Sequence, residues 1–198
     1  MKIAIIGAGN VGGTLGKRFG EQGHQVIFAT DHPESSKGET SVGEAAKNAE
    51  IIVLAVPYSA VDDAIANCGN LTDKIVIDCT NTIAPDFSGV TEIKEGSGGQ
   101  HVAAMAKPAK VVKAFNTIGF NIMANPKFPN GPATLLYAGD DGPAKKQVHQ
   151  LAESIGFAPI DAGPLSQAEY LEHLAWLWIS LAIKQGQGRE FVFMVENR

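Results

Sequence analysis

Cysteine is scarce in this sequence, and an excess of basic residues is missing. The 198 residues include two cysteines, Cys68 and Cys79, which are too few for a disulfide framework in a chain of this size. Lysine and arginine number 16 against 21 aspartate and glutamate, so the formal net charge is −5. A chain without a basic stripe is not expected to bind nucleic acid.

Long apolar runs are also missing. The most apolar segment, residues 171–183, contains Glu172 and His173 and is too short to cross a bilayer. The first residues enter a folded motif directly, without a basic segment or an apolar leader. We therefore expect a cytoplasmic protein without a membrane partner. Hydrophobic residues make up 44% of the chain, which is typical of a globular protein with a sizeable core.

Metal-ligating and catalytic patterns are not evident. The five histidines show no ligand spacing, so no metal site is predicted. No serine or cysteine stands in a pattern typical of a nucleophile. These histidines are His24, His32, His101, His149 and His173.

Short apolar runs alternate with helical patterns along the chain. Several runs are apolar without a period of two, which is typical of strands buried on both faces of a parallel sheet. The alternation predicts an α/β fold, a Rossmann-type doubly wound and mostly parallel sheet. The predicted strands are residues 2–6, 25–29, 51–56, 74–79, 111–115, 134–138 and 158–161, and the predicted helices are 12–22, 41–48, 60–67, 101–106 and 143–155.

The pattern changes after residue 161. Gly163-Pro164 ends it, and Ser166 is the predicted cap of a helix that runs to about Lys184, with Glu169 in the capping-box position. Residues 191–195 are a candidate terminal strand. We therefore expect a dinucleotide-binding domain at residues 1–161 and a C-terminal helical appendage at 162–198. The helix contains two tryptophans and needs an apolar cover.

A glycine loop follows the first predicted strand. Gly7-Ala8-Gly9-Asn10-Val11-Gly12 has the spacing G-x-G-x-x-G between a buried strand and an amphipathic helix, the context that gives this motif its specificity. Gly7 allows a tight turn, Gly9 allows close approach of a pyrophosphate, and Gly12 allows the helix to pack on the strand. The sequence therefore predicts a nicotinamide dinucleotide at this loop.

The second strand leaves the choice of dinucleotide open. It ends in Ala29-Thr30-Asp31-His32. Asp31 is placed to bind a ribose 2′-hydroxyl, as in NAD-binding proteins. The polar side chains around it are alternatively able to hold the 2′-phosphate of NADP. These are Thr30, His32, Ser35, Ser36 and Lys37.

Four segments carry a resemblance that covers nearly the whole chain. They are residues 2–12, Leu54-Ala55-Val56-Pro57, Val112-Lys113-Ala114-Phe115-Asn116-Thr117, and Asp161-Ala162-Gly163-Pro164-Leu165-Ser166 with the helix that follows. In these segments the chain resembles the NADPH-dependent reductases of the deazaflavin coenzyme F-420. It is more distantly similar to the cytosolic domain of membrane ferric reductases and to the N-terminal domain of 6-phosphogluconate dehydrogenases.

The resemblance implies a homodimer and hydride transfer between a nicotinamide and a flavin-like ring beneath the C-terminal helix. It implies that the glycine loop holds the pyrophosphate and that Thr30 lies beside the 2′-phosphate. Asp31 stands where the family usually has arginine. Ala55, Val56 and Pro57 are expected near the ribose and nicotinamide. Asn116 and Thr117 are expected to face the nicotinamide, and Asn81 is a further candidate.

The resulting prediction is an NAD(P)-dependent oxidoreductase. Its expected cofactor is NADP, with NAD as the alternative, and its expected second substrate is a small-molecule electron acceptor, a deazaflavin or flavin. Hydride transfer between two cofactors requires ring positioning and exclusion of water more than acid–base groups. A non-catalytic redox sensor that binds NAD(P) is the alternative function.

Overall fold

A single eight-stranded sheet forms the centre of the computed structural model, which describes residues 1–34, 36 and 38–196. The strand order is β10-β9-β6-β5-β4-β1-β2-β3, and neighbouring strands are parallel except β6 and β9, which are antiparallel. This confirms the predicted mostly parallel Rossmann-type fold. The strands are β1 (Lys2–Ile6), β2 (Gln25–Ala29), β3 (Glu39–Thr40), β4 (Ile51–Leu54), β5 (Ile75–Asp78), β6 (Lys110–Ala114), β9 (Thr134–Gly139) and β10 (Ala158–Asp161).

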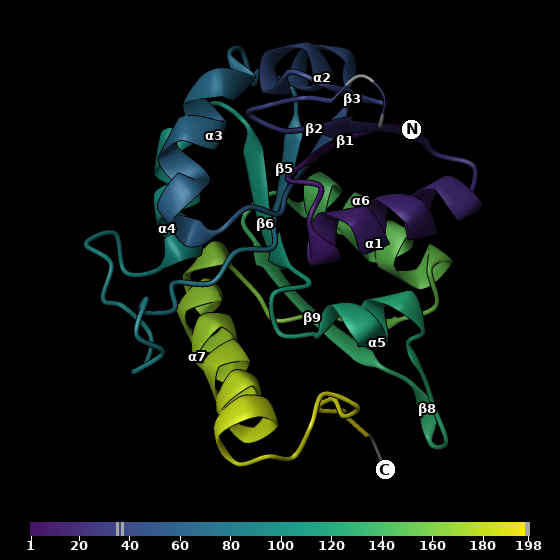
Figure 1. Ribbon diagram of the computed structural model, residues 1–198, viewed down its shortest axis with the longest axis vertical. Coiled ribbons are helices and arrows are strands. Elements are labelled where there is room, and N and C mark those ends of the chain that lie inside the picture. The colour runs from purple at the N-terminus through teal and green to yellow at the C-terminus, as the bar shows by residue number, and fades with distance from the viewer. Residues whose placement is uncertain (35, 37, 197–198) are drawn as a thin grey trace.

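Helices cover both faces of the sheet (Figure 1). One face carries α1 (Asn10–Glu21), α5 (Phe120–Ala124) and α6 (Gly142–Ser154). The other carries α2 (Val42–Asn48), α3 (Val61–Cys68) and α4 (Gly98–Met105). Helix α7 (Ala168–Ile179), with a π-helical turn at Ser180–Lys184, packs on α4 and β9.

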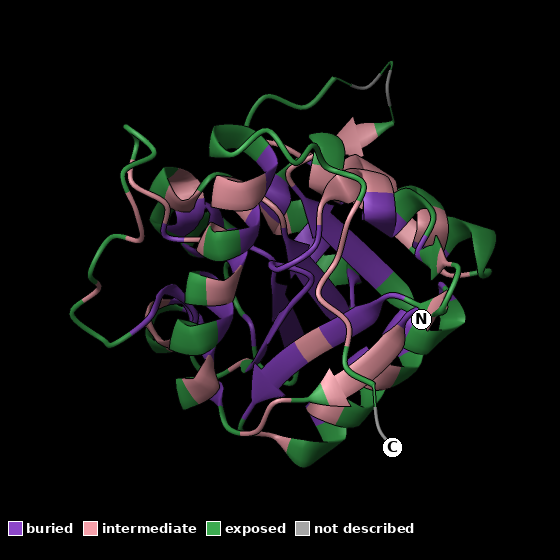
Figure 2. Cartoon of the chain, turned by 90° about the horizontal axis from the view of Figure 1, so that it is seen from below, coloured by how far each residue is buried: buried purple, intermediate pink, exposed green. Residues whose placement is uncertain are grey.

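Alternation along each strand divides the core into two parts. In β1, Ile3 and Ile5 pack with Leu15 and other residues of the α1 and α6 face. Ala4 and Ile6 pack with the α2, α3 and α4 face. Successive side chains of a strand point to opposite faces, and here both faces are covered. Strands β1, β4, β5, β6 and β9 are therefore buried along most of their length, whereas β2, β3 and β10 are mostly half-buried (Figure 2).

Local signals explain where several helices begin. Ser41 accepts a hydrogen bond from Glu44 N and caps α2, and Asp141 accepts one from Ala144 N and caps α6, which are the expected roles of these residue types. The predicted element bounds are correct to within a few residues. The prediction missed β3, α5 and the hairpin of β7 (Lys127–Phe128) and β8 (Gly131–Pro132), which are too short to show a periodic pattern.

The C-terminal segment corrects two predictions. Ser166 lies inside a 3-10 turn at Leu165–Gln167, and α7 begins after Gln167 without a side-chain cap, so the capping box with Glu169 is wrong. The segment 191–195 is not a strand. Its backbone is bonded to side chains instead: Trp178 Nε1 donates to Phe191 O at 2.9 Å, and Val195 N donates to Thr134 Oγ1 at 3.0 Å.

Candidate functional site

The glycine loop joins the C-terminal end of β1 to α1. Gly7 has φ +96°, and a Cβ there would lie 2.5 Å from Ala55 O. A Cβ on Gly12 would collide with Gly7 O. At Gly9, in contrast, a Cβ would meet no atom within 4 Å. Two of the glycines are therefore required by the protein's own packing, whereas Gly9 borders open space.

The first turn of α1 faces that space without a cap. Gly9 is its N-cap residue and makes no side-chain cap hydrogen bond, and no acidic residue lies in the first turn. The first backbone N–H groups of a helix have no intrahelical acceptor and lie at the positive end of its dipole. Asn10 is exposed, and Ala8 and Val11 are half-buried beside this turn. This arrangement fits a pyrophosphate.

A cavity of about 430 Å³ lies beyond the end of β2. Thr30 and Asp31 are in its wall, and Asp63 of α3 gives it a second carboxylate. Thr30 Oγ1 donates to Glu39 Oε2 at 3.4 Å. The remaining lining residues are Ser41, Val42, Gly43 and Asn67.

The other residues predicted near this cavity do not line it in the described part of the chain. His32 and Ser36 are exposed and are not part of its wall. Ser35 and Lys37 lie outside the described residues. The structure therefore brings Thr30 and Asp31 to one cavity.

The ends of three central strands bring the remaining predicted residues to one edge of the sheet. Ala55, Val56 and Pro57 follow β4, where Ala55 and Val56 border Gly7. Asn81 follows β5, and Asn116 and Thr117 follow β6. Ligands of open α/β sheets bind outside the carboxyl ends of the strands, so this edge and the glycine loop form one candidate site.

Asn81 and Asn116 form a reciprocal pair at this edge. Asn81 Nδ2 donates to Asn116 O at 2.9 Å, and Asn116 Nδ2 donates to Asn81 Oδ1 at 2.9 Å. Asn116 is 7% exposed, and its Oδ1 has no partner among the described residues. Buried polar atoms are normally hydrogen-bonded. The pair therefore orients one amide oxygen that remains available as an acceptor.

A buried ion cluster that was not predicted from the sequence lies behind this edge. Lys113 Nζ lies 2.9 Å from Asp78 Oδ2 and 2.8 Å from Glu172 Oε1, and it donates to Thr80 O at 2.6 Å. The Lys113 side chain is fully buried. Burial lowers the pKa of this amine, but the two carboxylates outweigh that effect and raise the pKa above its usual value. Lys113 is therefore a charged partner of both acids.

Glu172 connects α7 to the N-terminus of α4. Its carboxylate accepts hydrogen bonds from Gly98 N and Gly99 N, both at 3.0 Å, and from Thr82 Oγ1 at 3.2 Å. A Cβ on Gly99 would lie 2.8 Å from Ala168 Cβ, so glycine allows the two helices to approach. The available signals were a lysine in the apolar strand β6 and an acid in the apolar helix α7.

A second cavity, of about 310 Å³, lies between α7 and the segment 90–97. Its wall includes Glu169, Glu172 and His173 from one face of α7. His173 is exposed. Within residues 1–34, 36 and 38–196, no group of three His, Cys, Asp or Glu side chains is placed to hold a metal ion. No helix in that part of the chain is long and apolar enough to cross a membrane.

Comparison with known proteins agrees with this geometry. Residues 2–82 match a family model described as NADP oxidoreductase, coenzyme F-420-dependent. The crystal structure of a candidate F-420-dependent NADP reductase from an Arthrobacter species superimposes with a TM-score of 0.90 at 27% identity, and the match covers 100% of both chains. Both matches support the F-420-dependent NADP oxidoreductases as the family that this chain resembles. An NADP-dependent oxidoreductase is the class of enzyme that these matches support.

Two further relatives show how widely this fold extends. A hypothetical protein of Sinorhizobium meliloti is 31% identical with a TM-score of 0.76, over 84% of this chain and 86% of that one. Metalloreductase STEAP3 of Rattus norvegicus is 28% identical over 86% of this chain, but over 36% of its own length. The chain thus spans about a third of the length of the curated relatives it matches.

Proposed function

We propose that this chain binds NADP(H) along the C-terminal edge of its sheet and transfers a hydride between the nicotinamide and a second ring system. The observation that carries the proposal is the glycine loop. Open space at Gly9 lies against an uncapped and uncharged first turn of α1. In this proposal the backbone of residues 7–12 binds the pyrophosphate.

The nicotinamide half is assigned to the edge that Asn81 and Asn116 occupy. A nicotinamide carboxamide has N–H donors, and Asn116 Oδ1 is a buried acceptor without a partner among the described residues. Thr117 follows Asn116, and Val56 and Pro57 follow β4 at the same edge. These residues orient the ring and exclude water from it.

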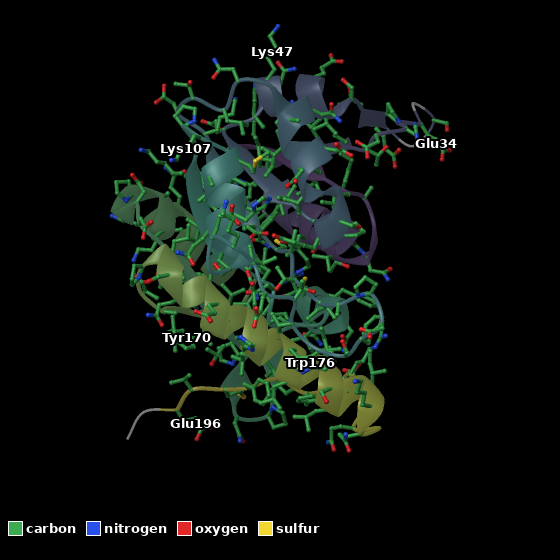
Figure 3. All side chains as sticks on the ribbon, turned by 90° about the vertical axis from the view of Figure 1, so that its left-hand side faces the viewer. Glu34, Lys47, Lys107, Tyr170, Trp176 and Glu196 are labelled. Carbon is green, nitrogen blue, oxygen red and sulfur yellow. The ribbon has the colours of Figure 1, made fainter. Side chains whose placement is uncertain are left out.

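The bound nicotinamide supplies the hydride chemistry. The chain's own contribution is positioning, which is sufficient for transfer between two rings. The proposed second substrate is a deazaflavin- or flavin-like acceptor, as the family description supports. Glu169, Glu172 and His173 of α7 line the cavity beside the segment 90–97, and in this proposal α7 is the roof over that acceptor. Figure 3 shows this helix, with Tyr170 and Trp176 labelled.

Asp31 is the residue that weakens the preference for NADP over NAD. It shares its cavity with Asp63, and a carboxylate about 4 Å from a 2′-phosphate costs roughly 1–4 kcal/mol for each pair of charges. We propose NADP because of the family, with NAD as the alternative that a direct comparison decides.

The outer surface of α7 supports a homodimer as the proposed assembly. Tyr170, Leu177 and Ile183 are 64%, 48% and 51% exposed. Tyr170 and Leu177 belong to α7, and Ile183 belongs to the turn that follows it; larger exposed apolar patches mark association surfaces in soluble proteins. A second copy is the partner proposed here, and sedimentation equilibrium at micromolar concentration tests it, because a strict monomer contradicts it.

The reaction is tested in an anaerobic assay with oxidised coenzyme F-420 as the acceptor, NADPH or NADH as the donor, and loss of the deazaflavin absorbance as the signal. Turnover with NADPH supports the proposal in full. Turnover with NADH alone supports the reaction and assigns Asp31 to the ribose. Free flavins are tested in parallel.

A Gly9→Asp variant tests the site itself. The new carboxylate enters open space, so the fold remains, but it repels the pyrophosphate. We expect folded protein that has lost dinucleotide binding by calorimetry. Retained binding contradicts the placement of the site. If wild type binds the dinucleotide but turns over no acceptor, the non-catalytic redox sensor is favoured instead.

A further inference from the structure

The buried ion cluster holds Thr80, the residue that directly precedes Asn81 of the amide pair at the proposed nicotinamide edge. Asp78 Oδ1 accepts from Thr80 N at 2.9 Å and from Thr80 Oγ1 at 2.7 Å, while Lys113 Nζ donates to Thr80 O at 2.6 Å. Both backbone groups and the hydroxyl of Thr80 are therefore held. Thr80 directly precedes Asn81, whose amide bonds Asn116.

Lys113 also acts through its own strand. It lies opposite Asp78 in the register of β5 and β6, and Asn116 follows it in the segment that continues β6. Phe115 has φ +66°, a value that L-residues seldom adopt. The backbone therefore turns sharply between Lys113 and Asn116. The ion cluster holds Lys113 before this turn, and Asn81 holds Asn116 after it, so these contacts together determine where Asn116 lies.

Helix α7 forms the third side of this arrangement. Glu172 binds Lys113, the N-terminus of α4 and Thr82 at once. Thr82 directly follows Asn81, so the asparagine lies between two residues that the cluster holds. Removing ions from water is costly, and apolar residues of the same volume often stabilise a fold equally well. Stability alone does not explain three buried charges at this place.

We propose that Lys113, Asp78 and Glu172 are positioning residues for the nicotinamide half of the dinucleotide. They hold Thr80 and Thr82, and through them the Asn81–Asn116 pair, so that Asn116 Oδ1 is directed to the carboxamide. The proposal rests on the proposed function, because it presupposes that a nicotinamide dinucleotide binds at this edge. It adds that the affinity for the nicotinamide depends on how α7 packs, because Glu172 is a residue of α7.

The test compares two ligands that differ by the nicotinamide. Lys113→Met keeps the length of the side chain and removes its charge and its three bonds. Calorimetry measures the Kd for NADPH and for 2′-phospho-ADP-ribose, which lacks the nicotinamide. We expect NADPH to bind at least about tenfold more weakly, which corresponds to about 1.4 kcal/mol. We expect 2′-phospho-ADP-ribose to bind within about twofold of wild type.

Lys145→Met is the matched control. Lys145 Nζ also bonds a carboxylate and a carbonyl oxygen, Asp161 Oδ2 at 2.8 Å and Gly163 O at 3.3 Å. Asp161 ends β10 and Gly163 follows it, and β10 is the outermost strand on one side of the sheet. Both ligands should bind this variant as they bind wild type. An equal loss for both ligands in Lys113→Met, or a loss for neither, overturns the proposal.

Thr80→Val keeps the proposal testable if Lys113→Met does not fold. It leaves every charge in place and removes the hydroxyl that donates to Asp78. We expect an affinity loss of about threefold for NADPH and none for 2′-phospho-ADP-ribose. Unchanged affinity for both ligands contradicts the positioning role. If wild type binds NADH instead, NADH and ADP-ribose replace this pair of ligands. If wild type binds no dinucleotide, the proposed function fails, and this inference fails with it.

Discussion

The glycine loop and the buried ion cluster lie at the same edge of the sheet but are built in opposite ways. The loop consists of backbone: its features are a φ of +96° at Gly7 and the absence of a Cβ at Gly9 and Gly12. The cluster consists of side chains whose partners are distant in the sequence. Asp78 and Lys113 are 35 positions apart, and Glu172 accepts a hydrogen bond from Gly99 N, 73 positions away. The loop is local in sequence, and the cluster is not.

This difference determines how each region tolerates change. The loop tolerates many side chains at Ala8, Asn10 and Val11, which are at least partly exposed, but it cannot accept a Cβ at Gly12. The cluster tolerates no change of charge, because each member is the partner of another buried group. An uncompensated buried charge costs more than the intact pair contributes. The predictions below test this difference.

Glu172→Gln should have the largest effect. The carboxylate accepts four donors: Lys113 Nζ, Gly98 N, Gly99 N and Thr82 Oγ1. Glutamine has the same shape, but its NH₂ group cannot accept a hydrogen bond from the donors that it faces. Lys113 then keeps one carboxylate partner, Asp78. We expect the free energy of unfolding to fall by about 3–5 kcal/mol, measured by urea denaturation.

Glu169→Gln is the control, one helical turn earlier on α7. Glu169 is exposed, so the same substitution should change the free energy of unfolding by less than about 0.5 kcal/mol. If the two variants are equally stable, Glu172 does not carry the connection between α7 and α4.

Gly12→Ala should have an intermediate effect. A single added methyl group meets Gly7 O and lies 2.9 Å from Ile5 Cγ2, and neither neighbour is the far end of a flexible side chain. Overpacking of this kind costs about 1–3 kcal/mol. Urea denaturation measures the loss, and dinucleotide affinity should fall with it because α1 is displaced from β1.

Gly13→Ala sharpens this result with the neighbouring residue of the same helix. A Cβ there would lie 3.4 Å from Ala8 O, an ordinary contact. Alanine is favoured over glycine inside a helix by about 0.5–1 kcal/mol, so this variant should be slightly more stable than wild type. Destabilisation of both variants to the same extent would show that the helix position, not the contact with Gly7, sets the cost.

The same difference explains what could be predicted from the sequence. The glycine loop, the strands and the edge formed by Asn81 and Asn116 follow from local motifs, apolar runs and the rule that parallel strands end on one side. Thr30 and Asp31 line one cavity beyond β2, and their contact with the dinucleotide stays a prediction. His32 was not brought to their cavity, because a polar segment after a strand has no periodic pattern that fixes its direction.

The ion cluster could not be predicted in the same way. Lys113 and Glu172 each look like one of two like charges in a short element, with Lys110 in β6 and Glu169 in α7, and their pairing depends on where α7 packs on the sheet. The terminal strand predicted at residues 191–195 failed for a related reason. Phe191 stacks on Trp178 with ring centroids 5.4 Å apart, and Val192 packs against the core, so these two apolar side chains are explained by packing and not by pairing with a strand.

The smallest predicted effect concerns His101, which joins α4 to α3 and to the segment 92–97. His101 of α4 bonds Asp62 Oδ1 of α3 at 2.7 Å, and its Nδ1 lies 3.4 Å from Glu95 Oε2. The hydrogen bond with Asp62, together with both carboxylate charges, raises the pKa of His101 above its usual value. The protonated form is therefore favoured in the folded state.

The sign of the pH dependence follows from this shift. A raised folded-state pKa stabilises the fold fully below the unfolded pKa of about 6.5, and the gain is lost as pH rises through the folded pKa. The stability of wild type relative to His101→Gln should therefore be higher at about pH 6 than at about pH 8.5, by about 1 kcal/mol in urea denaturation. His24, whose pKa burial lowers, acts in the opposite direction but is present in both proteins and cancels. A constant difference between the two proteins across this range would mean that His101 joins α3 to the segment 92–97 without a charge.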